Sequence, residues 1–365
     1  MTSIPLPPGA PRALEKLLAD FGAGRKAALA RAVSMVEDGR AGSDLLLAAL
    51  HPLVGRARRI GLTGPPGAGK STITTTIAAL LRQQGLTVGI VAVDPTSPFS
   101  GGALLGDRVR MESVALDPGV FIRSMATRGS LGGLAATTRE VCDVLDAFGV
   151  DRILIETVGV GQSELDIART ADTSLVVLVP EAGDSIQTLK AGLMEIADVF
   201  VVNKADRPGA DRLRNDLELM LGLRGGHGMK NVPAHHGIDL KHVANPARAA
   251  RKAAAEEEPD AWTPAVLRSV GVTGEGIPEL LATLDRHFAY LERSGGLEVR
   301  RRARLRDRVK DVVFQRLARR LWHDAATNQW IDEQIPALAA GSTTPYEVAD
   351  VLLQRSGPLM TGDPA

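Results

Sequence analysis

The strongest constraint on the fold is the glycine-rich segment GPPGAGKST at residues 64–72. An apolar run at residues 59–63 precedes it and a helix is predicted over residues 73–84, so the segment joins a strand to a helix. Glycines let several backbone N–H groups point at one phosphate group, and the helix N-terminus adds its positive dipole end. The spacing predicts a P-loop; the alternative is a glycine-rich turn without a ligand. The residues expected around the phosphates are Gly64, Pro65, Pro66, Gly67, Ala68, Gly69, Lys70, Ser71 and Thr72.

Composition excludes several classes of protein. Lys plus Arg equals Asp plus Glu, 43 each, so no global field draws the chain to nucleic acid or anionic lipid. The single cysteine, Cys142, leaves no internal disulfide and no multi-cysteine metal site. No apolar run approaches the roughly 20 residues that cross a bilayer, and the first residues lack the apolar stretch of a secretory signal. We therefore expect a cytoplasmic protein with no nucleic-acid or membrane partner.

Apolar, β-branched runs of strand length recur along the chain after residue 59. Helix-length segments separate them, and this alternation predicts an α/β fold with a doubly wound, mostly parallel sheet covered on both faces. Residues 13–54, rich in Ala and Leu, predict two or three short helices packed against it. The expected organisation is an N-terminal helical segment (1–55), a P-loop domain (56–292) and a C-terminal helical arm (293–365). The predicted strands cover residues 87–94, 120–124, 152–158, 173–179, 199–203 and 266–270.

The C-terminal part begins with a strongly basic helix, predicted over residues 297–322. Apolar residues recur in it at helical spacing, and Arg and Lys far outnumber acidic residues around them. One interpretation is a basic face exposed to solvent. The other is an arm that docks a second subunit or an acidic partner. Further helices are expected at residues 330–338 and 345–353.

The segment Asn203-Lys204-Ala205-Asp206, directly after a predicted strand, favours guanine over adenine. An aspartate carboxylate can accept both hydrogens that guanine offers on its ring nitrogen and exocyclic amine, and adenine offers no such pair. A simple turn after a strand is the alternative, but the position after the P-loop in chain order favours GTP and GDP as ligands. The expected base readers are Asn203, Lys204 and Asp206, with backbone N–H groups from Ser269, Val270 and Gly271.

Three acidic residues lie where magnesium ligands are expected. Asp94 ends the strand at 87–94, Glu156 lies in the strand at 152–158, and Asp107 lies in a loop between them. Because the carboxyl ends of parallel strands face the ligand crevice, Asp94 and Glu156 are expected near Ser71, although each acid can instead be a helix cap or a surface residue. Lys70, Asp94 and Glu156 are the candidate catalytic residues, and Gly159 is a candidate backbone donor to the terminal phosphate.

Several segments together with the P-loop resemble the MeaB/ArgK family, the GTPases associated with methylmalonyl-CoA mutase. They are DPTSPFSGGALLGDRVRM (94–111), ETVGVGQSE (156–164), EAGDSIQTLKAGLMEIADVFVVNKAD (181–206) and VTGEGIPEL (272–280). The resemblance covers residues 40–292 and implies a homodimeric, magnesium-dependent P-loop GTPase with helical extensions at both ends. It also implies a chaperone that gates adenosylcobalamin delivery to an acyl-CoA mutase and protects that enzyme. An adenosyltransferase is the further partner that it implies, and residues 184–190 match a mobile loop that answers to the mutase.

Two features depart from the family pattern. Relatives usually have Ser-Ala where this chain has Ser269-Val270, and the stretch 223–261 is longer than expected. That stretch holds four of the seven histidines, so a maturation factor for nickel or another metal centre is an alternative, against a solvated loop. A protein kinase linked to amino-acid transport is a further alternative, disfavoured because no second substrate pocket with a catalytic base is apparent. The four histidines are His227, His235, His236 and His242.

Overall fold

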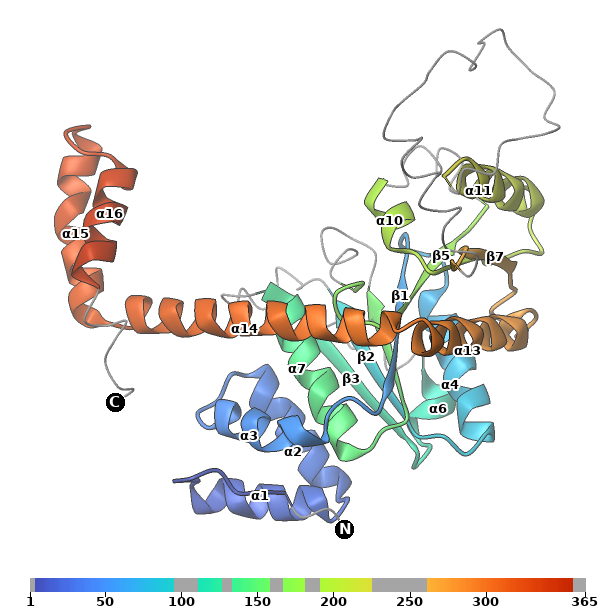
Figure 1. The fold of residues 1–365 in the computed structure, drawn as a ribbon, viewed down its shortest axis with the longest axis horizontal. Helices are drawn as coiled ribbons and strands as arrows, with labels where there is room; N and C mark the ends of the chain where they lie inside the picture. Colours follow the sequence, from blue (N-terminus) through green and yellow to red (C-terminus); the bar gives the residue numbers. More distant parts are fainter. Residues whose placement is uncertain are drawn as a thin grey trace, which may run out of the picture.

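The computed structural model describes residues 4–94, 111–126, 133–157, 167–180, 191–224 and 261–356. Three short helices open the chain, as predicted: α1 (Arg12–Gly22), α2 (Lys26–Glu37) and α3 (Ser43–Leu50), followed by the single turn η1 (His51–Leu53). Their apolar side chains share one core with α7 (Gly133–Phe148), where the rings of Phe21 and Phe148 pack edge to face. The N-terminal helices therefore pack against the sheet through α7 (Figure 1).

A seven-stranded sheet forms the centre of the described part of the chain, in the order β3-β2-β4-β1-β5-β6-β7 with neighbouring strands parallel. This confirms the predicted doubly wound α/β fold. The last strand ends two residues earlier than predicted, so Ser269 and Val270 lie in the loop that follows it. The strands are β1 (Arg58–Thr63), β2 (Val88–Asp94), β3 (Val120–Ala126), β4 (Arg152–Thr157), β5 (Thr173–Leu178), β6 (Val199–Val202) and β7 (Ala265–Arg268).

Helices cover both faces of the sheet because the strands are apolar on both sides; β5 and β6 are buried along their whole length. One face packs against α4 (Lys70–Gln83), α6 (Glu112–Ala115) and α13 (Ile277–Arg293). The other packs against α7 at one end and against α10 (Ala191–Ile196) and α11 (Ala210–Arg224) at the other. Within the described residues, no helix is both long enough and apolar enough to span a bilayer.

Three helices complete the chain: α14 (Gly296–Trp322), α15 (Ala325–Ala339) and α16 (Pro345–Arg355). All three were predicted, and each is longer than its predicted range. Asp324 caps α15, and Thr344 with Glu347 forms a capping box on α16. In Figure 1, α14 runs along the sheet domain and past it, so that α15 and α16 stand away from the sheet.

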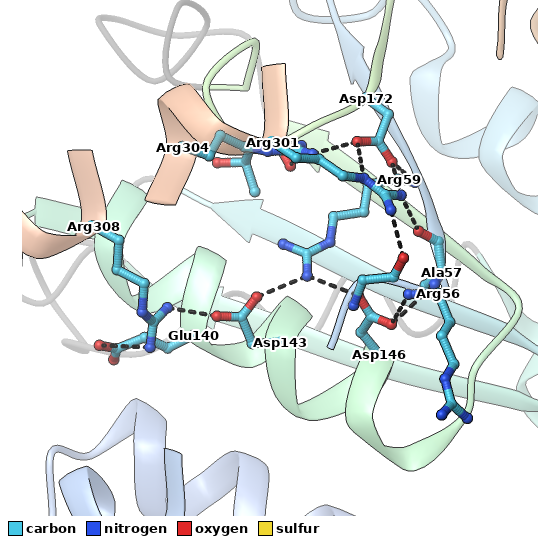
Figure 2. Close-up of polar contacts among 12 residues, drawn as sticks. Arg56, Ala57, Arg59, Glu140, Asp143, Asp146, Asp172, Arg301, Arg304 and Arg308 are labelled. Carbon is cyan, nitrogen blue, oxygen red and sulfur yellow. Dashed lines mark hydrogen bonds and ion pairs between the residues drawn. The ribbon is translucent and has the colours of Figure 1, made fainter. Parts of the chain in front are cut away.

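The first half of α14 is held to the sheet domain by what we call the arginine clamp, made of Arg300, Arg301, Arg304 and Arg308. Arg300 binds both carboxylate oxygens of Asp198, at 2.9 and 2.8 Å. Arg301 and Arg304 converge on Asp172, while Arg308 donates to Asp143 at 2.6 Å (Figure 2). The predicted solvent-exposed face is therefore wrong for these four arginines: the acidic groups that they meet belong to the same chain.

Burial of the aspartates explains why each of them is paired with an arginine of the clamp. Asp172 is completely buried, and an isolated charge in that position would be very costly. Burial raises the pKa of the Asp172 carboxyl, but the charges of Arg304 and Arg301 outweigh it and hold the pKa below its ordinary value. Its Oδ2 also accepts the Arg59 backbone N–H at 3.0 Å, so the clamp is fixed to the start of β1.

Candidate nucleotide site

The glycine-rich loop leaves β1 and enters α4 through two tight turns. Gly64 has φ 137°, and a Cβ atom there would lie 2.1 Å from the Val177 carbonyl oxygen. Gly69 has φ 86°, and its Cβ would lie 2.4 Å from the Asn203 side-chain nitrogen. Both positions therefore require glycine. Gly69, in the left-handed region, is the N-cap of α4, which therefore begins at Lys70, three residues earlier than predicted.

Lys70 lies inside this loop and is 5% exposed. Its Nζ donates to the carbonyl oxygens of Gly64 at 2.8 Å and Pro65 at 2.9 Å. The Lys70 ammonium group therefore lies beside Gly64 and Pro65, at the N-terminus of the fourteen-residue helix α4. Backbone N–H groups at such a helix start, with a lysine beside them, suit a phosphate group. Pro66, Gly67 and Thr72 are exposed around it, and Ala68 is buried.

Ser71 on α4 and Glu156 on β4 lie together, as the sequence predicts. The Ser71 hydroxyl donates to Oε1 of Glu156 at 2.5 Å, and the carboxylate is 4% exposed. A hydroxyl and a carboxylate at the edge of a phosphate-binding loop fit the oxygen ligands that Mg²⁺ prefers. Asp94 ends β2 at the same edge of the sheet. Asp107 and Gly159 lie outside the described residues.

Asn203 ties the P-loop to the loops expected to read the base. Its Nδ2 donates to the Ala68 carbonyl oxygen at 2.8 Å, and its Oδ1 accepts from the Gly271 N–H at 2.9 Å and the Ser269 hydroxyl at 3.1 Å. With 3% exposure, this amide is buried and satisfied on both sides. Sequence reasoning assigned Asn203 to the base alone and missed this bridge, which joins residues 135 apart in the chain.

The rest of the loop that is expected to read the base has an unusual backbone conformation and is more exposed to solvent. Lys204 has φ 56°, a left-handed conformation that is uncommon outside glycine and recurs at functional sites. The Ala205 N–H donates to the Ser269 carbonyl oxygen at 3.0 Å, which holds the two loops together. Asp206 is exposed, and Val270 forms an isolated bridge with Glu275. The carboxylate is therefore accessible to a ligand beside a rigid loop.

Two buried threonine contacts near Glu156 were missed by sequence reasoning. The Thr74 hydroxyl lies 3.1 Å from Oε2 of Glu156, and the Thr157 hydroxyl donates to that of Thr63 at 3.2 Å. The signal for Thr74 was its position four residues after Lys70, which places both on one face of a helix.

The alternative metal site predicted from the sequence depends on four histidines. The four histidines of the stretch 223–261 lie outside the described residues. Among the residues that the structure does describe, no group of three or more His, Cys, Asp or Glu side chains could hold a metal ion. Cys142 is buried, and burial raises the pKa of its thiol to about 12, which suits an inert apolar role.

Comparisons with known proteins agree with this geometry. The family model for methylmalonyl-CoA mutase-associated GTPase MeaB matches residues 29–326. A Pyrococcus horikoshii protein named as a GTPase is 42% identical over 342 residues, covering 94% of this chain and 98% of its own length. The mouse methylmalonic aciduria type A homolog, mitochondrial, is 32% identical over 361 residues, 94% of this chain and 79% of its own. A crystal structure of a LAO/AO transport system kinase is similar with a TM-score of 0.63 and 25% identity, over 95% of this chain and 98% of that one.

Proposed function

The chain belongs to the MeaB family of methylmalonyl-CoA mutase-associated GTPases, and from this we propose that it is a GTP-driven chaperone of an acyl-CoA mutase. The chain is a GTPase. Its proposed task is to gate delivery of adenosylcobalamin to the mutase and to protect that enzyme. The family match over residues 29–326 supports the link to a mutase. An adenosyltransferase is a further partner that we propose.

We assign the phosphates of GTP and GDP to the loop 64–72, with Lys70 at the terminal phosphates. The contact that supports this assignment is the hydrogen bond from Asn203 to the Ala68 carbonyl oxygen, because it joins the loop 64–72 to the loop proposed to read the base. Asp206 would accept the two hydrogens of guanine, and Lys204 would lie along the base. The backbone N–H groups expected to read the base donate within the chain instead: that of Val270 donates to the Glu275 carbonyl oxygen at 3.0 Å and that of Gly271 to Oδ1 of Asn203 at 2.9 Å.

We assign Mg²⁺ to Ser71 and Glu156, with Asp94 and Asp107 as further oxygen ligands. The support is the 2.5 Å contact between the Ser71 hydroxyl and the buried Glu156 carboxylate, next to the first turn of α4. A bound Mg²⁺ would neutralise charge on the phosphates during hydrolysis. Gly159 remains the proposed backbone donor to the terminal phosphate.

A base swap tests whether the nucleotide controls the mutase. Asp206→Asn should turn the preference from guanine to xanthine nucleotides, because an amide can donate to the carbonyl group that xanthine carries in place of the guanine amine. Wild type should bind purified methylmalonyl-CoA mutase differently with GDP and with a non-hydrolysable GTP analogue. The Asp206→Asn variant should show that difference with the xanthine nucleotides instead.

The outcome is measured by titration calorimetry and by sedimentation of the mixture. Equal binding of GTP and ATP by wild type would contradict the base-reading assignment. If the affinity for the mutase does not depend on the bound nucleotide in wild type or in the Asp206→Asn variant, the proposed gating is contradicted, while the GTPase assignment stays intact. Arg207→Ala, an exposed neighbour in the same loop, serves as the matched control and should keep guanine preference.

We also propose that the arm pairs two copies of the chain. Large apolar side chains are exposed on α14 to α16, most of them beyond the clamp, and we propose that together they form the surface that a second copy covers. Phe314→Asp in the full chain should give a monomer in sedimentation, and Leu116→Asp, an exposed leucine on the sheet domain, should not. A dimeric Phe314→Asp variant would contradict this surface. The exposed side chains are Leu305, Val309, Val313, Phe314, Leu317, Trp322, Ile335, Tyr346, Val351 and Leu353.

A further inference from the structure

Thr74 lies on α4, one helical turn after Lys70, and is completely buried. Its Oγ1 lies 2.9 Å from the Lys70 carbonyl oxygen and 3.1 Å from Oε2 of Glu156. We propose that Thr74 is a positioning residue, which holds Glu156 in the orientation that binds magnesium. This inference rests on the magnesium assignment made above.

A threonine that only bonds back to its own helix would have no such role. Thr75 is of that kind: its hydroxyl donates to the Ser71 carbonyl oxygen, one turn earlier, at 2.7 Å. Thr74 differs because a carboxylate lies within reach as a second acceptor. A hydroxyl has one proton, and an ionised carboxylate is a stronger acceptor than a neutral carbonyl. The Glu156 contact should therefore compete well for the Thr74 proton.

The two hydroxyls near Glu156 divide its oxygens between them. Ser71 donates to Oε1 and Thr74 lies beside Oε2. Because Thr74 lies beside the second oxygen, it would hold the carboxylate and leave Oε1 and the Ser71 hydroxyl as the groups that would bind Mg²⁺. A glutamate has one more rotatable bond than an aspartate and loses more conformational freedom when it is fixed. A buried donor at its far end reduces the freedom that the ion would otherwise have to remove.

Magnesium-dependent release of a fluorescent GDP tests this role in the full-length protein. The measurement is the release rate against Mg²⁺ concentration, together with the rate in excess EDTA. Thr74→Val removes the hydroxyl and keeps the shape, and it should raise the half-saturating Mg²⁺ concentration by about tenfold. Its release rate in EDTA should match wild type, because the nucleotide contacts themselves are unchanged. Thr74→Ser restores the hydroxyl and should restore the wild-type Mg²⁺ dependence.

Thr75→Val is the matched control, because it deletes a neighbouring hydroxyl whose partner is the Ser71 carbonyl oxygen. It should leave the Mg²⁺ dependence near wild type. The proposal is overturned if Thr74→Val keeps the wild-type dependence, if Thr74→Ser shifts as far as Thr74→Val, or if Thr74→Val speeds release equally with and without the ion. If the rate of GDP release from wild type does not depend on Mg²⁺ concentration, the magnesium assignment is overturned, and the inference with it.

Discussion

The two edges of the parallel sheet are both built from strand ends and charged side chains, yet the charges have different partners. At the amino edge, Asp172 and Asp198 precede β5 and β6 and are held by arginines of α14. At the carboxyl edge, Lys70 and Ser71 follow β1 and lie beside backbone carbonyls and Glu156. The amino edge satisfies buried charges within the chain. The carboxyl edge offers a cation and a helix N-terminus that suit an external anion.

Because the charges at the two edges have different partners, substitutions at each edge should change a different measured quantity. A buried ion pair adds little net stability over an apolar contact, but breaking it leaves an uncompensated charge. The arginine clamp therefore fixes where α14 lies, and its loss should appear in the free energy of unfolding. Because the loop at the carboxyl edge is our proposed nucleotide site, changes in it should appear in ligand affinity.

The largest effect is expected from Asp172→Ala at the amino edge. The change leaves Arg301 and Arg304 without the carboxylate that they share, and the free energy of unfolding without nucleotide should fall by about 3–5 kcal/mol. Urea unfolding measures this, and the Kd for GDP of the folded variant should stay at the wild-type value. Asp285→Ala breaks the ion pairs of the half-exposed Asp285 carboxylate with Arg58 and, more loosely at 3.7 Å, with Arg152, and it should cost less than Asp172→Ala, about 1 kcal/mol. Normal stability with weakened GDP binding would reverse the comparison.

Lys70→Ala should have the next largest effect, and on the opposite quantity. Affinity for GTP and GDP should fall at least about 100-fold, which corresponds to about 2.7 kcal/mol, because the cation at the phosphates is lost. Calorimetric titration measures it, and unfolding without nucleotide should change less than for Asp172→Ala. Lys26→Ala removes an exposed lysine that also donates to a backbone carbonyl, that of Pro118, and should leave GDP binding unchanged. Equal affinity in the Lys70 variant would show that the carboxyl edge is not the phosphate site.

Asp198 gives the amino edge a pH dependence. Burial raises the pKa of this carboxyl, but the His287 ring nitrogen, 3.3 Å from Oδ1, and the hydrogen bonds from Arg300 outweigh burial and lower the pKa to about 2. An unfolded aspartate titrates near 3.9, so the stabilisation is complete above that pH and is lost as the pH falls through about 2. Wild type should exceed Asp198→Asn by about 2–3 kcal/mol of unfolding free energy near neutral pH. Unfolding measured across pH 2–5 should show the gap closing toward pH 2; a constant gap would contradict the ion pair.

The smallest change in the free energy of unfolding is expected from an exposed arginine of α14, in contrast to the arginines of the clamp. Arg302 lies between clamp arginines in the sequence but points to solvent, where it pairs with Glu298 four residues earlier; the two side chains are 76% and 68% exposed. Arg302→Ala should change the free energy of unfolding by no more than about 0.5 kcal/mol. Arg304→Ala, with a side chain 14% exposed, should cost several times more. Equal costs would mean that burial does not separate the two faces of this helix.

Local patterns made much of the fold predictable. The strands and the helices between them follow from runs of apolar residues, and the loop 64–72 follows from glycines between a strand and a helix. Ser71 and Glu156, 85 residues apart, could be paired because the carboxyl ends of parallel strands share one edge. The positions of the Asp94 side chain, Asp107 and Gly159 remain predictions.

The sequence alone determined the class of fold, and it predicts the phosphate loop and the acidic and base-reading residues, because each depends on residues close together in the chain or on a rule of sheet topology. Tertiary structure alone decided where the arginines of α14 go, how Asn203 joins two loops, and that Thr74 reaches Glu156. Arg300 and Asp198 are 102 residues apart, and Arg308 and Asp143 are 165 apart. The physical reason is burial: which carboxylates become inaccessible to water, and so need an arginine, is settled only when distant segments pack.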